Sequence, residues 1–382
     1  MEPQRPIVEA VARTAAGDPS ATLLEWSSER LGAGASEELG QSEGLLRVSG
    51  LVATKGAQER WSAIVKTLRD SQILVGDDHP DVHDPHGVQY WRREADVFTS
   101  GVIDDSIEGF GAPRCFRVDH LGHEAVIWME DIQPEHEGGW PIDRYWTAAR
   151  HLGAFNGRFA ARVPEAARPW ASRGRLVDWV RAAASGISMM QGGHPRNFLR
   201  TWMSGRSAER VDRLYRRRAE MLRLLELLPE TLCHHDAHRR NLISVRDGEH
   251  QRTIAVDWAM AGTGRLGEDL AVLTGVSLQF LDVPMSDHVE FEAAVIDGYV
   301  SGLRELGWTG RETTLRSGYK AALSLFMGVA AAGIWYSGVS AQGDLALAER
   351  IIGHPADEIA EQWAEMQPYL LDLGEEALLA AV

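Results

Sequence analysis

The feature that most constrains this chain is a short β-hairpin predicted inside a half of the sequence that is otherwise helical. Residues 242–245 and 253–256 are apolar and β-prone, and the segment "RDGEHQ" between them carries an Asp-Gly turn signal. If the pairing is symmetric about Glu249, Asn241 and Asp257 lie opposite each other at the open end of the hairpin. We therefore expect two oxygen-bearing side chains to meet there.

The polar run "HHDAHRRN" leads into this hairpin and places Asp236 beside the same end. The oxygens of Asn241 and Asp257 form a hard ligand set that suits Mg²⁺, which shares its remaining positions with waters and phosphates. Asp236 stays free to accept a hydroxyl proton, so the three residues divide the roles that phosphoryl transfer requires. A transition-metal site built from the histidines and a polar turn without chemistry remain alternatives.

Two motifs around the hairpin resemble those of the aminoglycoside phosphotransferase and choline kinase family, small-molecule relatives of the protein kinases. "HHDAHRRN" fits the H-x-D-x-x-x-x-N loop, and "AVDWAMAGTGRLGEDLA" resembles the partner motif with Asp-Trp, a Gly-containing link and Asp-Leu-Ala. The resemblance implies that Asp236 is the catalytic base or hydroxyl-orienting residue. It also implies that Asn241 and Asp257 are the Mg²⁺ ligands and that Asp269 braces the loop.

The three histidines of the run receive supporting roles from the same resemblance. His234 matches the first position of the motif, and His238 matches the common extra histidine two places after the aspartate. His235 stands where the family usually has glycine. This departure either changes the backbone geometry or adds a substrate contact, and both remain open.

A lysine and a glutamate earlier in the chain provide a second indication of nucleotide binding. Period-2 alternation in "WSAIVKTLR" puts Lys66 on one face of a strand with apolar residues. Glu94 falls on the inward stripe of a helix predicted over residues 89–102, where a lone carboxylate would be costly. The pair resembles the kinase lysine and helix glutamate that hold the ATP phosphates. Taken alone, Lys66 could also be an edge residue with its amine in solvent.

Two further segments resemble nucleotide-binding parts of the family by their position. In "ERLGAGASEELGQ", Gly32 and Gly34 would let the backbone approach phosphate and Ser36 could donate a hydrogen bond. The third glycine of the protein-kinase pattern is absent, so an ordinary glycine-rich turn stays open. "IWMEDIQ" resembles the hinge, whose backbone groups at Glu130 and Ile132 would meet adenine. Its alternative is a plain connection between lobes.

The expected architecture is an α+β, bilobal, protein-kinase-like fold. At 382 residues the chain exceeds the size at which one core usually keeps growing. We expect a small N-terminal β-sheet lobe with one key helix, residues 1–130, and a larger, mainly helical C-terminal catalytic and substrate-binding lobe, residues 131–382. The strongest strand and helix candidates are residues 44–53, 60–69, 114–120 and 123–130, and residues 144–160 and 209–228, respectively.

Composition excludes several classes of protein. A net charge of -16 repels nucleic acid, and two cysteines exclude a disulfide framework and fit a reducing cytoplasm. The N-terminus lacks the pattern of a secretion signal. Residues 321–339 approach membrane-spanning length, but their Ala, Gly and Ser content favours a buried core helix. We therefore expect neither a nucleic-acid nor a membrane partner.

Other enzyme motifs fit less well. "GTGRLG" matches G-x-G-x-x-G, but it follows the second arm of a hairpin and no second β-α-β crossover comes after it. Only 11 residues separate Asp257 from Asp269, too few for the peptide-binding segment of a protein kinase, and no Ala-Pro-Glu motif follows. A Walker A motif is absent as well.

The sequence thus predicts an ATP- and Mg²⁺-dependent O-phosphotransferase acting on a hydroxyl of a small molecule. Net acidity favours a cationic acceptor such as an aminoglycoside, an amino sugar or another antibiotic. An amino alcohol or a sugar metabolite stays open as acceptor. A non-catalytic nucleotide-binding sensor or scaffold of the same fold is the second hypothesis, and the oligomeric state is not assigned.

Overall fold

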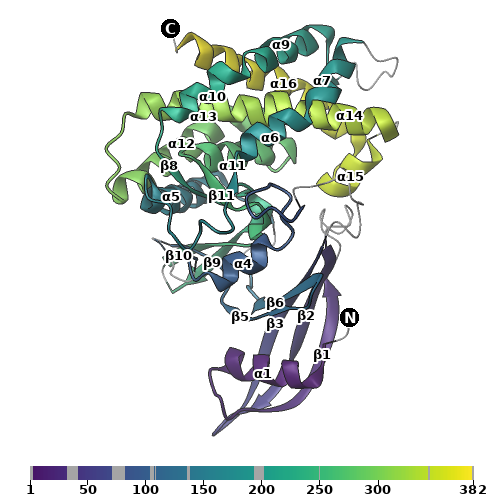
Figure 1. Cartoon of the computed structure of the whole chain (residues 1–382), viewed down its shortest axis with the longest axis vertical. Helices are drawn as coiled ribbons and strands as arrows, with labels where there is room; N and C mark the ends of the chain where they lie inside the picture. The colour runs from purple at the N-terminus through teal and green to yellow at the C-terminus, as the bar shows by residue number, and fades with distance from the viewer. Residues whose placement is uncertain are drawn as a thin grey trace.

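The computed structural model of this protein has an antiparallel sheet at one end and a larger, mostly helical part at the other (Figure 1). This is the α+β, bilobal arrangement that the sequence predicts. Strand β6 ends at Glu130 and helix α5 begins at Ile142, while the division into two domains at residue 130 stays a prediction. The described residues are 3–31, 42–70, 82–103, 107, 109–135, 138–192, 202–248, 250–342 and 345–380.

The N-terminal sheet has five antiparallel strands in the order β1-β2-β3-β6-β5. The hairpin turns predicted at Lys55–Gly56 and at Gly122 join β2 to β3 and β5 to β6, and Gly122 has a φ of 74° that favours glycine. Strand β1 and helix α1 were not predicted. The bounds are α1 Arg5–Ala16, β1 Thr22–Leu31, β2 Ser42–Ala53, β3 Gln58–Arg69, β5 Cys115–His120 and β6 Glu124–Glu130.

Strand β3 separates two hydrophobic cores. One face packs with α1 in a small core, and the other faces the main core of the protein. Lys66 lies on the second face, as alternation predicts, and is 7% exposed. Because β3 is paired on both sides, with β2 and β6, the interpretation of Lys66 as an edge residue is wrong. The residues of the first face are Trp61, Ala63 and Val65.

Helix α4, Arg93–Thr99, is shorter than the helix predicted over residues 89–102. Tyr90 precedes the helix instead of lying on its inward stripe. The reason is the side chain of Arg93, which donates to the carbonyls of Pro85, Gly87 and Val88 and so holds the preceding chain in a turn beneath the helix. Gly101, at a φ of 69°, follows the C-terminal end.

The C-terminal part is built on a close pair of helices, α5 and α12. Glycines allow this approach, because a Cβ on Gly298 would lie 2.3 Å from the Trp146 carbonyl oxygen and one on Gly302 would lie 1.9 Å from that of Arg150. The predicted helix over 209–228 is two helices, broken at Arg217. The bounds are α5 Ile142–Phe159, α6 Arg175–Ala182, α7 Ala184–Gln191, α9 Gly205–Arg216, α10 Arg218–Glu226, α11 Glu268–Gln279, α12 His288–Glu305, α13 Glu312–Leu323, α14 Ala332–Gln342, α15 Ala346–Ile352 and α16 Ala356–Leu379.

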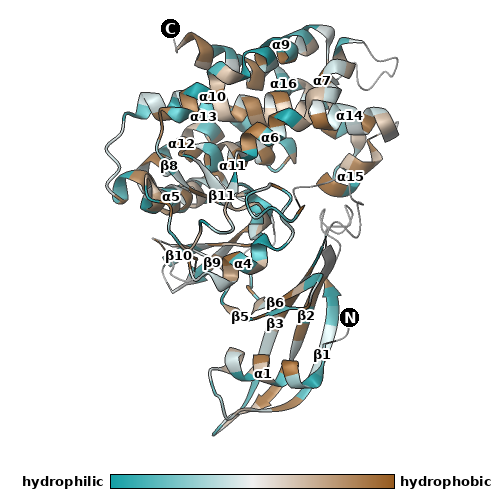
Figure 2. Ribbon diagram, viewed as in Figure 1, coloured by the Kyte–Doolittle hydropathy of each residue, from teal (hydrophilic) through white to brown (hydrophobic). Residues whose placement is uncertain are grey.

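The apolar segment over residues 321–339 is a core helix, as predicted. It runs from α13 through a π-helix, Ser324–Ala331, into α14. The continuous helix Glu312–Ala341 is long and apolar enough to cross a membrane, but 72% of its most apolar window is buried inside the protein. Figure 2 shows hydrophobic residues along α13 and α14, whereas the exposed strand β1 is mostly hydrophilic.

The predicted hairpin is present, with a corrected register. Strands β9, Leu242–Asp247, and β10, His250–Ala255, pair with His250 opposite Asp247. Asn241 consequently lies opposite Val256, whose N–H donates to the Asn241 carbonyl at 2.9 Å. Asp257 follows one residue later and not directly opposite Asn241, because the observed register pairs Leu242 with Ala255 and so differs by one residue from the predicted symmetry.

Short strands surround the hairpin and the loop that leads into it, residues 234–241. Strand β4, Phe110–Gly111, adds to β10, and β7, Ser172–Arg173, and β8, Glu230–Cys233, flank β11, Gly262–Arg265. Since β11 runs antiparallel to β8, the "GTGRLG" segment does not open a Rossmann β-α-β unit, in agreement with the sequence.

Candidate active site

A buried lysine lies between two carboxylates where the sheet meets the helical part. Lys66 Nζ is 2.6 Å from Glu94 Oε2 and 2.9 Å from Asp257 Oδ1. Glu94 is 1% exposed, whereas the Asp257 side chain is 33% exposed. The structure thus brings together the lysine and the glutamate paired from sequence, and adds Asp257 as a second partner of the lysine.

Arg93 secures this arrangement, and sequence reasoning missed it. The fully buried guanidinium donates to the Trp170 carbonyl at 3.0 Å and to the Ala259 carbonyl at 2.9 Å. Helix α4 is thereby tied to the segment that follows Asp257, which holds Glu94 over the lysine. The sequence offered one indication of this role: Arg93 stands directly before Glu94, which was predicted to face inward.

Lys66, Glu94 and Asp257 form a triad in which the charge of the lysine and the charges of the carboxylates attract each other. Burial lowers the pKa of Lys66, but Asp257 and Glu94 outweigh it, so the pKa lies above its ordinary value. Burial raises the pKa of Asp257, but Lys66 outweighs it, so the Asp257 pKa lies below its ordinary value. Burial also dominates at Glu94 and raises its pKa. Lys66 is therefore a permanent cation and Asp257 a permanent anion near neutral pH.

Asp236 and Asn241 lie together on the loop before β9. Asn241 Nδ2 donates to Asp236 Oδ2 at 2.7 Å and to the Asp236 carbonyl at 3.0 Å. With the Asn241 N–H groups engaged in this way, its Oδ1 is the atom left to bind a metal. The Asp236 side chain is 33% exposed and can be reached by another molecule.

The donor set fits Mg²⁺. Asp257 offers a second carboxylate oxygen besides the one paired with Lys66, and Asn241 offers its Oδ1. The two residues sit at the same end of the hairpin because the Val256 N–H bonds to the Asn241 carbonyl. Asp257 has a φ of 62°, in the left-handed region that few non-glycine residues adopt.

His234 and His238 hold the loop. The His234 ring contacts the Val256 carbonyl through Nε2 at 3.0 Å, accepts the Asp236 N–H through Nδ1 at 3.2 Å, and packs against Trp258. His238 Nδ1 accepts the Arg240 N–H, and burial lowers the pKa of His238. These rings face different partners, so the alternative of a transition-metal site built from the histidines is wrong.

His235 occupies the usual glycine position with a φ of 61°, so it adopts the left-handed conformation that glycine would supply. Its Nε2 lies 3.3 Å from the Thr263 carbonyl, and burial lowers its pKa to about 4. Gly264 makes room for the ring, because a Cβ there would lie 2.7 Å from His235 Cε1. One glycine of "GTGRLG" thus serves packing.

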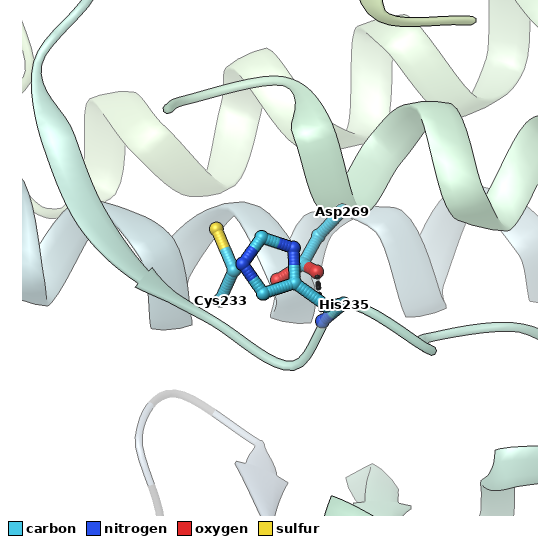
Figure 3. A group of neighbouring side chains, drawn as sticks. All are labelled: Cys233, His235 and Asp269. Carbon is cyan, nitrogen blue, oxygen red and sulfur yellow. Dashed lines mark hydrogen bonds between the residues drawn. The ribbon is translucent and has the colours of Figure 1, made fainter. Parts of the chain in front are cut away.

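Asp269 lies behind the loop with Cys233 and His235, as Figure 3 shows. Its Oδ1 accepts the His235 N–H at 2.7 Å and its Oδ2 accepts the His234 N–H at 3.0 Å. Ligand atoms of the three residues lie within 4.8 Å of one another. Since both Asp269 oxygens already accept loop N–H groups, the hydrogen bonding is that of a brace and not of a metal centre.

Asn156 and Tyr299 extend this brace, and neither was singled out from sequence. Asn156 Nδ2 donates to Asp269 Oδ2 at 3.0 Å, and Tyr299 Oη donates to Asn156 Oδ1 at 2.8 Å. Tyr299 Oη also accepts the Gly267 N–H at 3.0 Å. An asparagine inside the apolar stripe of the helix 144–160 was the one available signal.

The remaining predicted nucleotide contacts stay predictions. Gly32, Gly34 and Ser36 lie outside the described residues. The Glu130 N–H donates to the Arg114 carbonyl at 2.9 Å, so a contact with adenine would use other backbone groups of the segment that includes Ile132.

The model of the phosphotransferase enzyme family (APH) matches residues 112–309, just over half of the chain. The chain therefore belongs to this family, and the resemblance read from its motifs is confirmed. It is a small-molecule kinase. A sequence comparison with curated proteins gives no match.

Solved structures show the same fold at low sequence identity. A microcompartment-associated aminopropanol kinase is 14% identical with a TM-score of 0.50, and the alignment covers 97% of this chain and 98% of that one. The amicoumacin kinase hAmiN, in complex with AMP-PNP, Ca²⁺ and Ami, is 12% identical with a TM-score of 0.50, covering 97% and 96%. The protein-kinase-like fold predicted from sequence is confirmed.

Proposed function

We propose that this protein is an ATP- and Mg²⁺-dependent O-phosphotransferase that acts on a hydroxyl group of a small molecule. The observation that carries the proposal is the buried Lys66 between Glu94 and Asp257, at the same end of the hairpin as the Asp236–Asn241 pair. Lysine with two acidic partners, an asparagine and a second aspartate is the residue set that phosphoryl transfer needs.

On the nucleotide side, Lys66 would bind the phosphates of ATP while Glu94 keeps the ammonium group in place. Asn241 and Asp257 would hold Mg²⁺. When bound, this ion neutralises charge on the phosphates. Asp257 is already ionised in the free protein because Lys66 lowers its pKa, so no proton has to leave before the metal binds.

On the acceptor side, Asp236 would orient the hydroxyl. Its Oδ2 accepts the Asn241 amide, which leaves Oδ1 to accept the hydroxyl hydrogen. The acceptor oxygen would form its bond to the γ-phosphorus as the bond to the leaving oxygen of ADP breaks, and Asp236 would take the proton. His234 keeps the Asp236 backbone in place throughout.

An acceptor with an amino group is favoured by the net charge of -16 and by the similarity to an aminopropanol kinase; the other similar structure is an amicoumacin kinase. We therefore propose an aminoglycoside, an amino sugar or another antibiotic, with a role in resistance, and keep an amino alcohol or sugar metabolite as the alternative. A cytoplasmic location is part of this proposal.

The test measures acceptor-dependent release of ADP from Mg²⁺-ATP with a panel of amino sugars, amino alcohols and antibiotics. Asp257→Ala should abolish turnover while the melting temperature shows a folded protein. Asp372→Ala, which removes an exposed carboxylate on α16, is the matched control and should retain full activity. Substantial turnover by Asp257→Ala would refute the proposal, and ATP binding without acceptor-dependent ADP release would favour a non-catalytic sensor.

A further inference from the structure

A small pocket lies beside residues 234–241, the loop that carries Asp236 and is called the catalytic loop below. It is formed by Arg175 at the start of α6, His235 of the loop, Glu268 at the start of α11 and Phe326 of the π-helix, with apolar residues between them. The space is narrow and accommodates about one water-sized group. The pocket shares Arg175 and His235 with the surroundings of Asp236, so a group held there would lie next to the proposed base.

Arg175 is an unusual residue to find in such a pocket. It is 7% exposed, and its Nε finds no hydrogen-bond acceptor among the described residues. The guanidinium packs over the ring of Trp179 at 5.0 Å, a contact that fixes its plane but provides no acceptor for Nε. A buried N–H group without an acceptor is costly, which indicates a site built for a ligand.

The electrostatic surroundings indicate which ligand. Asp236 and Asp178 interact with Arg175 through charge alone, without a hydrogen bond between the side chains described here. Arg93 lies close enough to Arg175 for their positive charges to interact, and the N–H groups of Arg93 donate to backbone carbonyls. Burial raises the pKa of Glu268 to about 7, so at neutral pH this carboxyl is ionised only in part. Among the residues that line the pocket, Arg175 supplies the positive charge and Glu268 is the carboxyl group.

The helix that lines the pocket supports a functional role. Phe326 belongs to the π-helix, and its ring stacks on Trp179 at a centroid distance of 5.8 Å, so the π-helix, Trp179 and Arg175 form one stack. π-helical segments are rare and are frequently found at functional sites. The stack holds the guanidinium rigidly, which reduces the entropy lost when a ligand binds.

We propose that Arg175 is a specificity-determining residue that binds a carboxylate carried by the acceptor, beside the hydroxyl that Asp236 orients. This inference rests on the proposed function and refines it: the acceptor is an acidic or zwitterionic hydroxyl compound, not a purely cationic one. The Nε–H of Arg175, which has no acceptor among the described residues, would donate a charge-assisted hydrogen bond to one carboxylate oxygen. The narrow pocket admits one carboxylate oxygen and excludes a bulky cationic group.

The first experiment needs no turnover. Acetate is titrated into the full-length protein at constant ionic strength, with chloride as the compensating anion, and the Nε–H resonance of Arg175 is followed by NMR, assigned by its loss in Arg175→Lys. A saturable shift confined to Arg175 is expected. A shift with acetate no larger than with chloride overturns the proposal, whether or not the protein transfers phosphate.

The second experiment uses acceptor pairs that differ only in a carboxylate: L-serine with ethanolamine, and L-threonine with 1-amino-2-propanol. Among pairs that are phosphorylated, the carboxylate-bearing member should be preferred, and Arg175→Gln should raise its KM about tenfold to a hundredfold while the KM for ATP stays unchanged. Arg181→Gln, an exposed arginine of the same helix, is the matched control. A preference for the carboxylate-free members refutes the assignment, whereas no turnover with any acceptor counts against the proposed function and leaves the acetate titration to decide the subsite.

Discussion

Replacing Lys66 by methionine tests the buried charge arrangement most directly. The substitution keeps much of the side-chain volume but leaves Glu94, 1% exposed, without a cation 2.6 Å away. Removing one partner of a buried ion pair costs about 3–5 kcal/mol, because the remaining charge stays buried and uncompensated. We expect a loss of this size in the free energy of unfolding, and loss of ATP binding.

The loss should depend on pH. Burial raises the pKa of Glu94 in the folded protein, and Lys66 is the group that opposes this shift. In Lys66→Met the folded-state pKa of Glu94 therefore rises further above its unfolded value. A raised folded-state pKa means that stability is fully present below the unfolded pKa and is lost as the pH rises through the folded one. The variant should thus be nearest to the parent in stability at about pH 5 and furthest from it at about pH 8.

Urea denaturation followed by circular dichroism across this pH range measures the effect. The matched control is Lys320→Met. The ion pair of Lys320 with Glu376 is similarly short, at 2.7 Å, but lies at the surface, so its loss should cost at most about 1 kcal/mol and be independent of pH in this range. A second substitution, Glu94→Leu, in the Lys66→Met background should recover much of the loss. Equal stability of Lys66→Met and the parent at the upper end of the range would refute the reasoning.

Three further predictions follow from the site. Asp236→Asn should lower kcat about 10²- to 10⁴-fold with the KM for ATP unchanged, as measured by coupled ADP release, and an unchanged kcat would remove Asp236 as the base. At the left-handed position 235, His235→Val should destabilise the protein by about 1–2 kcal/mol more than His235→Gly in urea denaturation, and equal effects would contradict the role of φ. Because burial raises the pKa of Glu268 to about 7, the parent should lose stability as the pH rises toward and through 7. Glu268→Gln should make the melting temperature in thermal denaturation depend less on pH. An equal pH dependence in the parent and the variant would contradict this prediction.

Much of the local structure of this protein was determined by the sequence alone. The strands that carry Lys66 and the hairpin beside Asn241 were predictable because alternation and turn residues act over a few positions along the chain. The inward position of Glu94 followed from the cost of burying a carboxylate without a cation, which required the lysine as its partner. The spacing of Asp236 and Asn241 carried the family resemblance.

Only the tertiary structure decided which distant groups support these residues. Arg93 donates to carbonyls 77 and 166 residues away, and Asn156 bonds to Asp269, 113 residues away. No local pattern encodes such partners, because a buried polar side chain shows that it needs an acceptor but not where that acceptor lies. The same holds for Arg175: its sequence context is that of an ordinary helix start, and its buried Nε without an acceptor becomes evident only when α6, the catalytic loop and the π-helix pack around it.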